Sequence, residues 1–386
     1  MYAKLRTLPA LLAALAFGTA AHADDTLQSL VDATIRPVMA EYDIAGMAVA
    51  ISQNGQAHYF NYGVARLDDQ QPVTSDTLFE IGSLSKPLTA TLAALAQTTG
   101  KLTLMDSAGQ HWPELRGSQL EHTSLLNLGT YTAGGLPLQF PDNVTDPASM
   151  LTYYRHWQPE HIAGTHRRYS NPSIGLLGYL AARSMGQPFP ALMEGTLFPA
   201  LGMSHSYIQV PAAQMPSYAY GYSKDNQPLR VSPGMLDAEA YGVKTNAKDM
   251  LHFVQTNISP AGLTPDLQRA IGITHAGYYR VGEMTQGLGW ERYPYPISLE
   301  SLQAGNSPAM ALESQPATRL LPPEFEPSDS LFNKTGSTGG FGAYAVFVPS
   351  QNLGLVMLAN KNYPNAARIK AAYAILSALD KHATTH

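Results

Sequence analysis

Apolar and polar positions follow a strand-like pattern in two places, one near each end of the chain. Residues 47–64 contain two apolar runs separated by Asn54-Gly55, a dipeptide typical of the turn in a β-hairpin. Residues 341–358 contain a second pair of runs, separated by a polar stretch that begins with Pro349. Each pair predicts two antiparallel strands.

Helical periodicity flanks both hairpins. A stretch around residues 26–40 precedes the first, and residues 365–379 follow the second with apolar side chains such as Ile369 and Leu376 at helical spacing. The simplest arrangement joins the two hairpins into one antiparallel sheet covered by these helices. The sequence therefore predicts an α/β fold of the α+β type.

The middle of the chain has a different pattern, in which helical segments such as 172–185 alternate with loops rich in Gly, Pro and Tyr. We expect one domain over residues 24–386. Within it, an α/β lobe (about 24–100 and 285–386) would receive an inserted, mostly helical lobe (about 101–284). A cleft between two such lobes is a common place for a small-molecule site.

The start of the chain has the three parts of a signal peptide. Lys4 and Arg6 give positive charge, residues 8–17 form a short apolar run, and Ala21-His22-Ala23 provides a small-residue cleavage site. We expect residues 1–23 to be removed and the mature protein to be periplasmic; a retained N-terminal helix is the alternative. No later stretch is apolar enough to span a membrane, so we expect no membrane anchor.

Charge and residue content exclude several classes of function. The formal net charge is −5, and loss of Lys4 and Arg6 makes it −7, which disfavours nucleic acid or an anionic membrane as a partner. The chain has no cysteine, which excludes thiol nucleophiles and disulfides. The histidines form no H-x-H or H-E-x-x-H pair, so we expect neither a metal nor another cofactor. About 360 mature residues can bury a sizeable core alone, so we expect a monomer.

Ser83-Leu84-Ser85-Lys86 is the only S-x-x-K sequence in the chain. It follows Gly82 at the start of a run that ends at Gly100, so we expect it at the N-terminus of a helix. Residues three apart share a helix face, which lets the Ser83 hydroxyl meet the Lys86 amine, and N–H groups at a helix start suit a developing oxyanion. Taken alone, the pattern fits a helix-capping serine beside a solvated lysine better.

Lys334-Thr335-Gly336 is the only K-T-G sequence and stands shortly before the second hairpin. A lysine and a hydroxyl at a strand edge suit a substrate carboxylate, and a glycine lets a substrate backbone approach closely. The backbone N–H of Ser337 is a candidate second donor to an oxyanion. An ordinary polar turn before a strand is the alternative.

Tyr169-Ser170-Asn171 is one of three Y-x-N sequences, and the others begin at Tyr59 and Tyr363. Tyr59 falls inside the first hairpin, and Tyr363 lies beyond the last strand. Only Tyr169 stands between the other two motifs, in the inserted helical lobe. There it can face Ser83 across the cleft.

In this order, S-x-x-K, Y-x-N and K-T-G resemble the three motifs of penicillin-recognising serine enzymes. Y-x-N in second place is similar to class C β-lactamases and to some D-alanyl-D-alanine peptidases. Residues 134–141, 237–244 and 359–365 also resemble class C sequences. The resemblance runs from the first hairpin to the final helix, and it implies the serine β-lactamase and penicillin-binding-protein fold.

The resemblance implies catalytic roles for four side chains. Ser83 would be the nucleophile, Lys86 its activating partner and Tyr169 the proton-transfer residue, while Lys334 would meet the carboxylate side of the substrate together with Thr335. Ionising a phenol at pH 7 needs about 4 kcal/mol, which a cation about 4 Å away can supply at an effective dielectric near 20. Whether Tyr169 is the base, or relays a proton while Lys86 is the base, stays open.

Further residues would contact the substrate: Gln139 and Asn171 as amide donors, Tyr241 beside the bound acyl group, Gly336 at the substrate backbone and Asn365 near the carboxylate. Asn333 departs from the family pattern, because many class C members carry histidine before K-T-G. We therefore expect different hydrogen bonding beside Lys334.

These observations predict a serine β-lactamase that hydrolyses the lactam amide of cephalosporins and penicillins through an acyl-enzyme on Ser83, giving antibiotic resistance. A D-alanyl-D-alanine carboxypeptidase or esterase of the same fold shares the first chemical step and is the main alternative. A non-catalytic sensor of β-lactams is the third. The chain has no G-x-S-x-G sequence, which disfavours an α/β-hydrolase esterase.

Overall fold

The structure is a computed structural model that describes the backbone of residues 11–325 and 329–380, and side chains from residue 25 onward. The first ten residues of the expected export signal lie outside the described residues, and the rest falls on the helix α1 (Leu11–Glu41). Within the described ranges, no helix combines the length and apolar character needed to cross a membrane.

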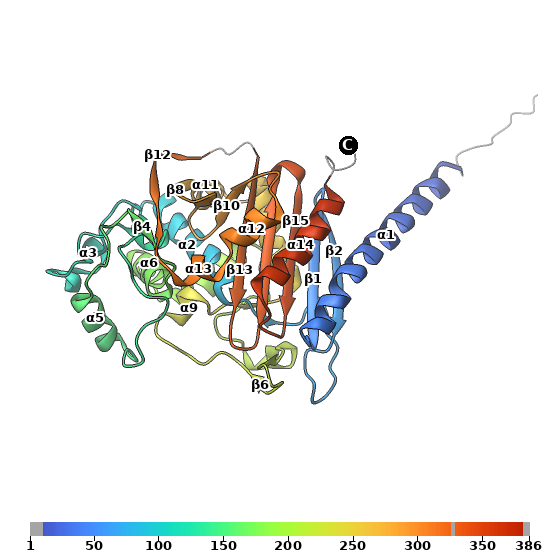
Figure 1. The fold of residues 1–386 in the computed structure, drawn as a ribbon, viewed down its shortest axis with the longest axis horizontal. Coiled ribbons are helices and arrows are strands. Elements are labelled where there is room, and N and C mark those ends of the chain that lie inside the picture. Colours follow the sequence, from blue (N-terminus) through green and yellow to red (C-terminus); the bar gives the residue numbers. More distant parts are fainter. Residues whose placement is uncertain (1–10, 326–328, 381–386) are drawn as a thin grey trace, which may run out of the picture.

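A nine-stranded antiparallel sheet forms the centre of the molecule, in the order β12-β8-β9-β10-β13-β14-β15-β1-β2 (Figure 1). The two predicted hairpins are confirmed as β1–β2 and β14–β15, and they join where Met47 of β1 pairs with Ala359 of β15. The strands are β1 (Gly46–Gln53), β2 (Gln56–Gly63), β8 (Gly277–Val281), β9 (Met284–Gln286), β10 (Glu291–Pro294), β12 (Thr318–Glu324), β13 (Ser330–Ser337), β14 (Gly342–Val348) and β15 (Leu353–Ala359).

Helices cover both faces of this sheet. On one face α1 packs against the C-terminal helix α14 (Asn365–Leu379), with α12 (Leu299–Gly305) beside it (Figure 1). On the other face α10 (Ala247–Ile258) packs against β15 and β1. The predicted helix over residues 365–379 is thereby confirmed.

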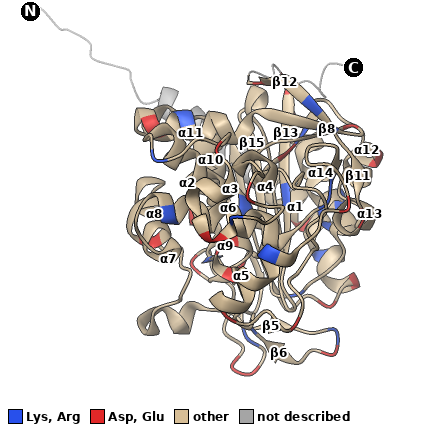
Figure 2. Cartoon of the chain, turned by 90° about the vertical axis from the view of Figure 1, so that its left-hand side faces the viewer, with Lys and Arg blue, Asp and Glu red and all other residues tan. Residues whose placement is uncertain are grey.

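Beside the sheet, α2 (Lys86–Thr98) and α6 (Asn171–Ser184) pack on each other (Figure 2). The structure has further α-helices besides these. They are α3 (Ala108–His111), α4 (Leu125–Gly129), α5 (Pro147–His156), α7 (Phe189–Leu192), α8 (Phe198–Ala200), α9 (Asp237–Ala240), α11 (Pro265–His275) and α13 (Pro308–Leu312). Three two-stranded pairs complete the fold: β3 (Phe79–Glu80) with β7 (Lys244–Thr245), β4 (His166–Arg167) with β11 (Gln315–Pro316), and β5 (Gly221–Tyr222) with β6 (Pro228–Leu229).

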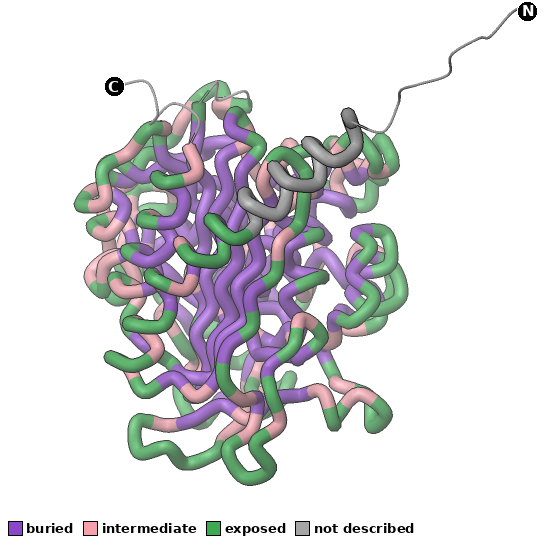
Figure 3. The backbone as a smooth tube through the Cα atoms, turned by 90° about the vertical axis from the view of Figure 1, so that its right-hand side faces the viewer, coloured by how far each residue is buried: buried purple, intermediate pink, exposed green. Residues whose placement is uncertain are grey.

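The central strands are buried on both faces (Figure 3). Met357 of β15 joins the hydrophobic cluster that contains Ile369 of α14. Its neighbour Leu358 joins the separate cluster that contains Phe253 of α10. Because both faces are covered, these strands are continuously apolar instead of alternating with polar residues.

Several strands were not predicted from the sequence, among them β13, which carries the K-T-G motif. The motif lies within a strand and not in a turn: Lys334, Thr335 and Gly336 pair with β14 on one side. The pairing with β10 ends at Asn333, so the other side of the motif is an unpaired strand edge, as expected. The expected helical lobe, residues 101–284, contains α10 and β8. Since α10 packs on the sheet and β8 belongs to it, both lie with the α/β part of the molecule.

Candidate active site

Ser83 lies on a tight 3₁₀ turn (Gly82–Ser85) that leads directly into α2. Gly82 has a positive φ of 51°, and a Cβ atom there would overlap the backbone of Ser337 on β13. A glycine is therefore required for the turn to approach the strand this closely. The sequence correctly predicted a helix start, but the nucleophile candidate stands on the turn that precedes the α-helix.

Lys86 is buried directly below Ser83. Its Nζ donates to the Ser83 Oγ at 2.8 Å, to the Asn171 Oδ1 at 2.6 Å and to the backbone oxygen of Ala240 at 2.8 Å. Burial lowers the pKa of Lys86 to about 8, in the same direction as the Lys334 cation and against the effect of Tyr169. A neutral amine would give its two N–H groups to Asn171 and Ala240 and turn its lone pair to Ser83.

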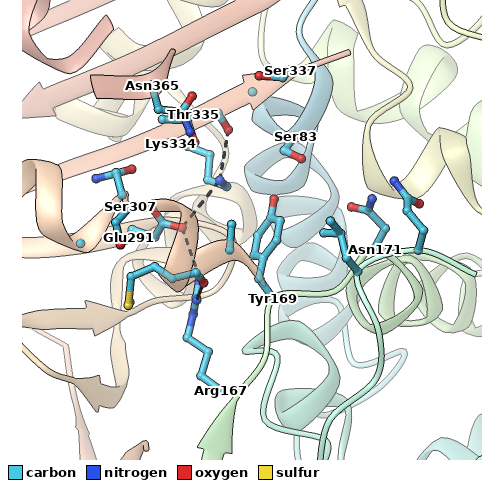
Figure 4. Close-up of a pocket in the computed structure, with 17 residues that line it drawn as sticks. Ser83, Arg167, Tyr169, Asn171, Glu291, Ser307, Lys334, Thr335, Ser337 and Asn365 are labelled. Carbon is cyan, nitrogen blue, oxygen red and sulfur yellow. Dashed lines mark hydrogen bonds and ion pairs between the residues drawn. The ribbon is translucent and has the colours of Figure 1, made fainter. Parts of the chain in front are cut away.

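Tyr169 directs its hydroxyl toward Ser83 (Figure 4). It stands immediately before α6, which Ser170 caps by accepting a hydrogen bond from the Ser173 N–H at 3.0 Å. Ser83 and Lys86 are the polar side chains beside the buried Tyr169 hydroxyl. Burial opposes ionisation, but the cations of Lys334 and Lys86 hold the pKa of Tyr169 below its ordinary value.

The K-T-G strand forms the opposite wall. Gly336 packs so closely on the turn before Ser83 that a Cβ atom would overlap the carbonyl oxygen of Ile81. Lys334 is buried, with its Nζ 5.0 Å from the centre of the Tyr169 ring. This close approach places the backbone of Ser337 beside Ser83, as an oxyanion site with two N–H donors requires.

Arg368 of α14 fixes the end of this strand. Its Nη1 donates to the Gly336 oxygen at 2.6 Å and to the Ser337 Oγ at 3.0 Å, and its Nη2 donates to the Asn362 Oδ1 at 2.9 Å. Burial lowers the pKa of the Arg368 guanidinium to about 10. The helix that follows the last strand thus supports the position of the K-T-G residues.

Glu291 of β10 supplies a buried anion that the sequence analysis missed. Its Oε1 lies 3.6 Å from the Lys334 Nζ and 3.4 Å from the Arg167 Nη2, so one carboxylate lies between two buried cations (Figure 4). Arg167 also donates to the Gln286 Oε1 at 2.7 Å. No motif marks Glu291, and only the pairing of β10 with β13 brings it to the site.

Asn333, the departure noted before K-T-G, is fully buried. Its side-chain amide lies beside the Tyr293 hydroxyl, and no hydrogen bond joins it to Lys334 among the described residues. Its backbone pairs with Glu291 on one side and Val346 on the other. The amide therefore adds no hydrogen bond that would hold Lys334.

Two adjoining cavities of about 240 Å³ each open above Ser83 and share Ser83, Gln139, Asn171 and Ser337 in their walls. The sequence-derived candidates come together here: Tyr169, Lys334, Thr335, Gly336 and Asn365 line the first cavity and Tyr241 lines the second, while Lys86 lies beneath. Asn171 contacts Lys86 through its oxygen and leaves its amide nitrogen for the cavity. Among the described residues, no group of His, Cys, Asp or Glu side chains is arranged to hold a metal.

The chain is similar to known β-lactamases along nearly its whole length. A family model described as Beta-lactamase matches residues 31–380. A β-lactamase from Pseudomonas fluorescens is 59% identical over 355 residues, which are 92% of this chain and 99% of that relative.

Two solved structures are similarly close. A β-lactamase/D-alanine carboxypeptidase from Pseudomonas syringae has a TM-score of 0.90 and 49% identity, over 91% of this chain and 99% of that one. A class C β-lactamase in complex with cefoxitin has a TM-score of 0.89 and 47% identity, over 92% of this chain and 99% of that one. The fold expected from the sequence is confirmed, and the chain belongs to the class C family of serine β-lactamases.

Proposed function

We propose that this β-lactamase hydrolyses cephalosporins and penicillins through an ester on Ser83, and so gives resistance to these antibiotics. The observation that carries the proposal is the 2.8 Å contact between the Lys86 Nζ and the Ser83 Oγ in a buried setting. A weakly basic amine beside a hydroxyl is the arrangement that activates a serine nucleophile.

In acylation, the Ser83 Oγ attacks the lactam carbonyl carbon while neutral Lys86 takes the hydroxyl proton. With a pKa of about 8, about a tenth of the lysine is neutral at pH 7. The N–H groups of Ser83 and Ser337 stabilise the tetrahedral oxyanion. The carbon–nitrogen bond then breaks, and the departing nitrogen takes a proton from the Tyr169 hydroxyl.

The resulting Tyr169 phenolate is stabilised by the cations of Lys86 and Lys334, which lower its pKa. Lys86 returns its proton to Tyr169, which restores both groups for the second step. Water then attacks the ester carbon, gives its proton to the same pair of residues, and releases Ser83 as the alcohol. Neither step requires a metal or another cofactor.

The substrate is held by groups around the two cavities. Thr335 and Lys334 on β13 contact the substrate carboxylate, assisted by Asn365 at the start of α14. Gln139 and the amide nitrogen of Asn171 donate to the substrate side-chain amide. Tyr241 contacts the acyl side chain from the second cavity.

The first experiment is stopped-flow hydrolysis of a chromogenic cephalosporin, with mass spectrometry of the quenched protein. Many fast turnovers with a transient adduct on Ser83 are expected. The Ser83→Ala variant should keep its fold and lose at least about 10⁴-fold in turnover, because the remaining groups stabilise the transition state only in part. Normal hydrolysis by that variant would contradict the proposal.

A D-alanyl-D-alanine carboxypeptidase activity is the second candidate, since the similar Pseudomonas syringae protein carries both names. The same experiment separates them. One stoichiometric burst followed by a long-lived adduct would favour the peptidase, because a tenfold slower deacylation needs only about 1.4 kcal/mol of additional barrier.

The mature protein, in this proposal, is a monomer that acts in the periplasm after removal of residues 1–23. Lys4, Arg6 and the small residues at 21–23 support the export signal. N-terminal sequencing and sedimentation of protein from the periplasmic fraction test both points. An intact first segment, or a dimer at low concentration, would contradict them.

A further inference from the structure

A separate cavity of about 700 Å³ borders α9 and shares no lining residue with the two cavities above Ser83. Its walls come from α6, α7 and α9, with α3 at its edge. Figure 2 shows where these helices lie. The reaction proposed above uses none of the side chains that line it. A hollow of this size accepts a small organic molecule.

Glu239 of α9 is the acidic side chain in the wall of this cavity. The residue is only 7% exposed, and its Cβ and Cγ pack so closely on α6 that a Cβ atom at Gly178 would lie 3.0 Å from each. Apart from its own backbone N–H, no donor among the described residues bonds to its carboxylate. Ionising a carboxylate that is largely shielded from water is costly, so a cation that enters the cavity gains a strong interaction with it.

The other charged groups at the cavity already have partners. His111 of α3 lies 2.9 Å from the Asp106 carboxylate. Arg183 of α6 donates to the His111 backbone oxygen at 3.2 Å and stacks on the Tyr179 ring. Arg183 has no carboxylate partner among the described residues, but it is exposed to water. Glu239 is therefore the buried ionisable side chain in this wall whose charge no described neighbour matches.

The rest of the wall is suited to an apolar body. The rings of Tyr179 and Phe189 line the cavity together with Pro188 and Pro190. Aromatic faces attract an ammonium group as well as a hydrocarbon chain. A metal ion is a poor fit, because a single carboxylate cannot complete its coordination.

We infer that this cavity is a second binding site, which takes a primary ammonium carried on an apolar body, with the Glu239 carboxylate as its counter-ion. Burial raises the pKa of Glu239 to about 7, against a smaller effect of its own N–H. Glu239 is thus about half ionised at neutral pH, and a bound cation favours its ionised form.

The second cavity and the active site share one short segment of the chain, because Glu239 is followed directly by Ala240, which bonds to Lys86. The Glu239 backbone oxygen accepts from the Thr89 Oγ1 at 2.6 Å, and the next backbone oxygen, of Ala240, accepts from the Lys86 Nζ at 2.8 Å. Tyr241 follows in the wall above Ser83. A ligand in the second cavity therefore contacts the same short segment that holds Lys86.

Calorimetric titration of the mature protein with 2-phenylethylammonium at pH 8 tests the inference without using activity. Saturable binding to one site is expected, and 2-phenylethanol, which has the same body without the charge, should bind at least tenfold more weakly. Glu239→Gln should weaken binding of the ammonium at least tenfold. Glu300→Gln, a change at an exposed carboxylate of α12, is the matched control and should leave it unchanged.

Gln187→Trp provides an independent test of location, because Gln187 is exposed at the cavity wall and its replacement narrows the cavity without touching the core. It too should weaken binding at least tenfold, even if Glu239→Gln failed to fold. The inference is overturned if the wild-type protein shows no saturable binding, if the alcohol binds as well as the ammonium, or if a folded cavity variant binds normally.

Discussion

The Lys86 Nζ lies 2.8 Å from the Ser83 Oγ, and two carbonyl oxygens, one from the Asn171 side chain and one from the Ala240 backbone, hold it there. These two acceptors come from α6 and α9, on separate segments of the chain. The amine is thereby fixed at the nucleophile before any substrate binds. Such preorganisation removes the cost of orienting the base during the reaction.

The pH dependence of acylation tests which group takes the Ser83 proton. Below pH 8, the single-turnover acylation rate should fall about tenfold per pH unit, since the pKa of Lys86 is about 8 and only the neutral amine accepts a proton. Above pH 8 the rate should level off. Stopped-flow acylation between pH 5.5 and 9 measures this.

The Tyr169→Phe variant separates lysine from tyrosine as the base. Its acylation should be about 10²- to 10⁴-fold slower but should still rise with pH. The midpoint should move below pH 8, because Tyr169 raises the pKa of Lys86 in the wild-type protein. A profile that becomes flat in this variant would make Tyr169 the base.

Glu291→Gln should destabilise the protein by about 3–5 kcal/mol, because it leaves Lys334 and Arg167 as buried cations without their shared anion. It should also lower the midpoint of the acylation profile, since Glu291 raises the pKa of Lys86. Urea unfolding and the same pH series measure both effects. Glu300→Gln serves as the surface control, and an equal stability of the two variants would contradict the role assigned to Glu291.

Gly336→Ala should reduce kcat/KM by about 10²-fold. Its new methyl group overlaps the Ile81 oxygen, so β13 must move away from the turn that carries Ser83 and the oxyanion donors separate. Gly272→Ala is the matched control, because nothing lies within 4 Å of a Cβ atom at that helical position. Steady-state kinetics of both variants check this, and full activity of Gly336→Ala would show that the strand does not position the donors.

The Glu239→Gln variant should become more stable relative to the wild-type protein as the pH rises. Folding raises the pKa of Glu239 from about 4.5 to about 7, so the wild-type protein loses stability across that interval as its buried carboxylate ionises. The loss amounts to about 3 kcal/mol and is complete above pH 7. Unfolding curves should show that the free energy of unfolding of the variant, relative to the wild type, is higher at pH 8 than at pH 5. An equal difference at both pH values would contradict this assignment.

The parts of the fold that the sequence predicted are those with strong apolar patterns. β1, β14 and β15 have continuous apolar runs, β2 carries the buried Phe60 and Tyr62 among exposed residues after the Asn54-Gly55 turn, and α14 has apolar residues at helical spacing. β13 could not be found in this way, because its last residues, Asn333 to Ser337, are polar although most of them are buried. Their burial depends on partners from distant segments, which no local pattern records.

The residues of the candidate site also fall into two groups, those that a sequence motif predicted and those that only the tertiary structure brings to the site. Ser83, Lys86, Tyr169 and Lys334 belong to spaced motifs, and the structure brings them together. Glu291 and Arg368 have no motif, although one carboxylate and one guanidinium hold the lysine and the strand of the K-T-G sequence. Charges that support a site through tertiary contacts are visible only after the strands have been placed.

Because β1 pairs with β15, the central sheet can be completed only after the C-terminal part of the chain has been synthesised. Strand Gly46–Gln53 finds its neighbour Leu353–Ala359 about 300 residues further on, and Arg368 then bonds to Gly336 from the helix after it. A growing chain that contains every catalytic motif still lacks the strand that completes its sheet and the guanidinium that fixes its oxyanion wall. Activity therefore waits for the final segment, and a chain cut shortly after the K-T-G strand would carry all three motifs without forming a working site.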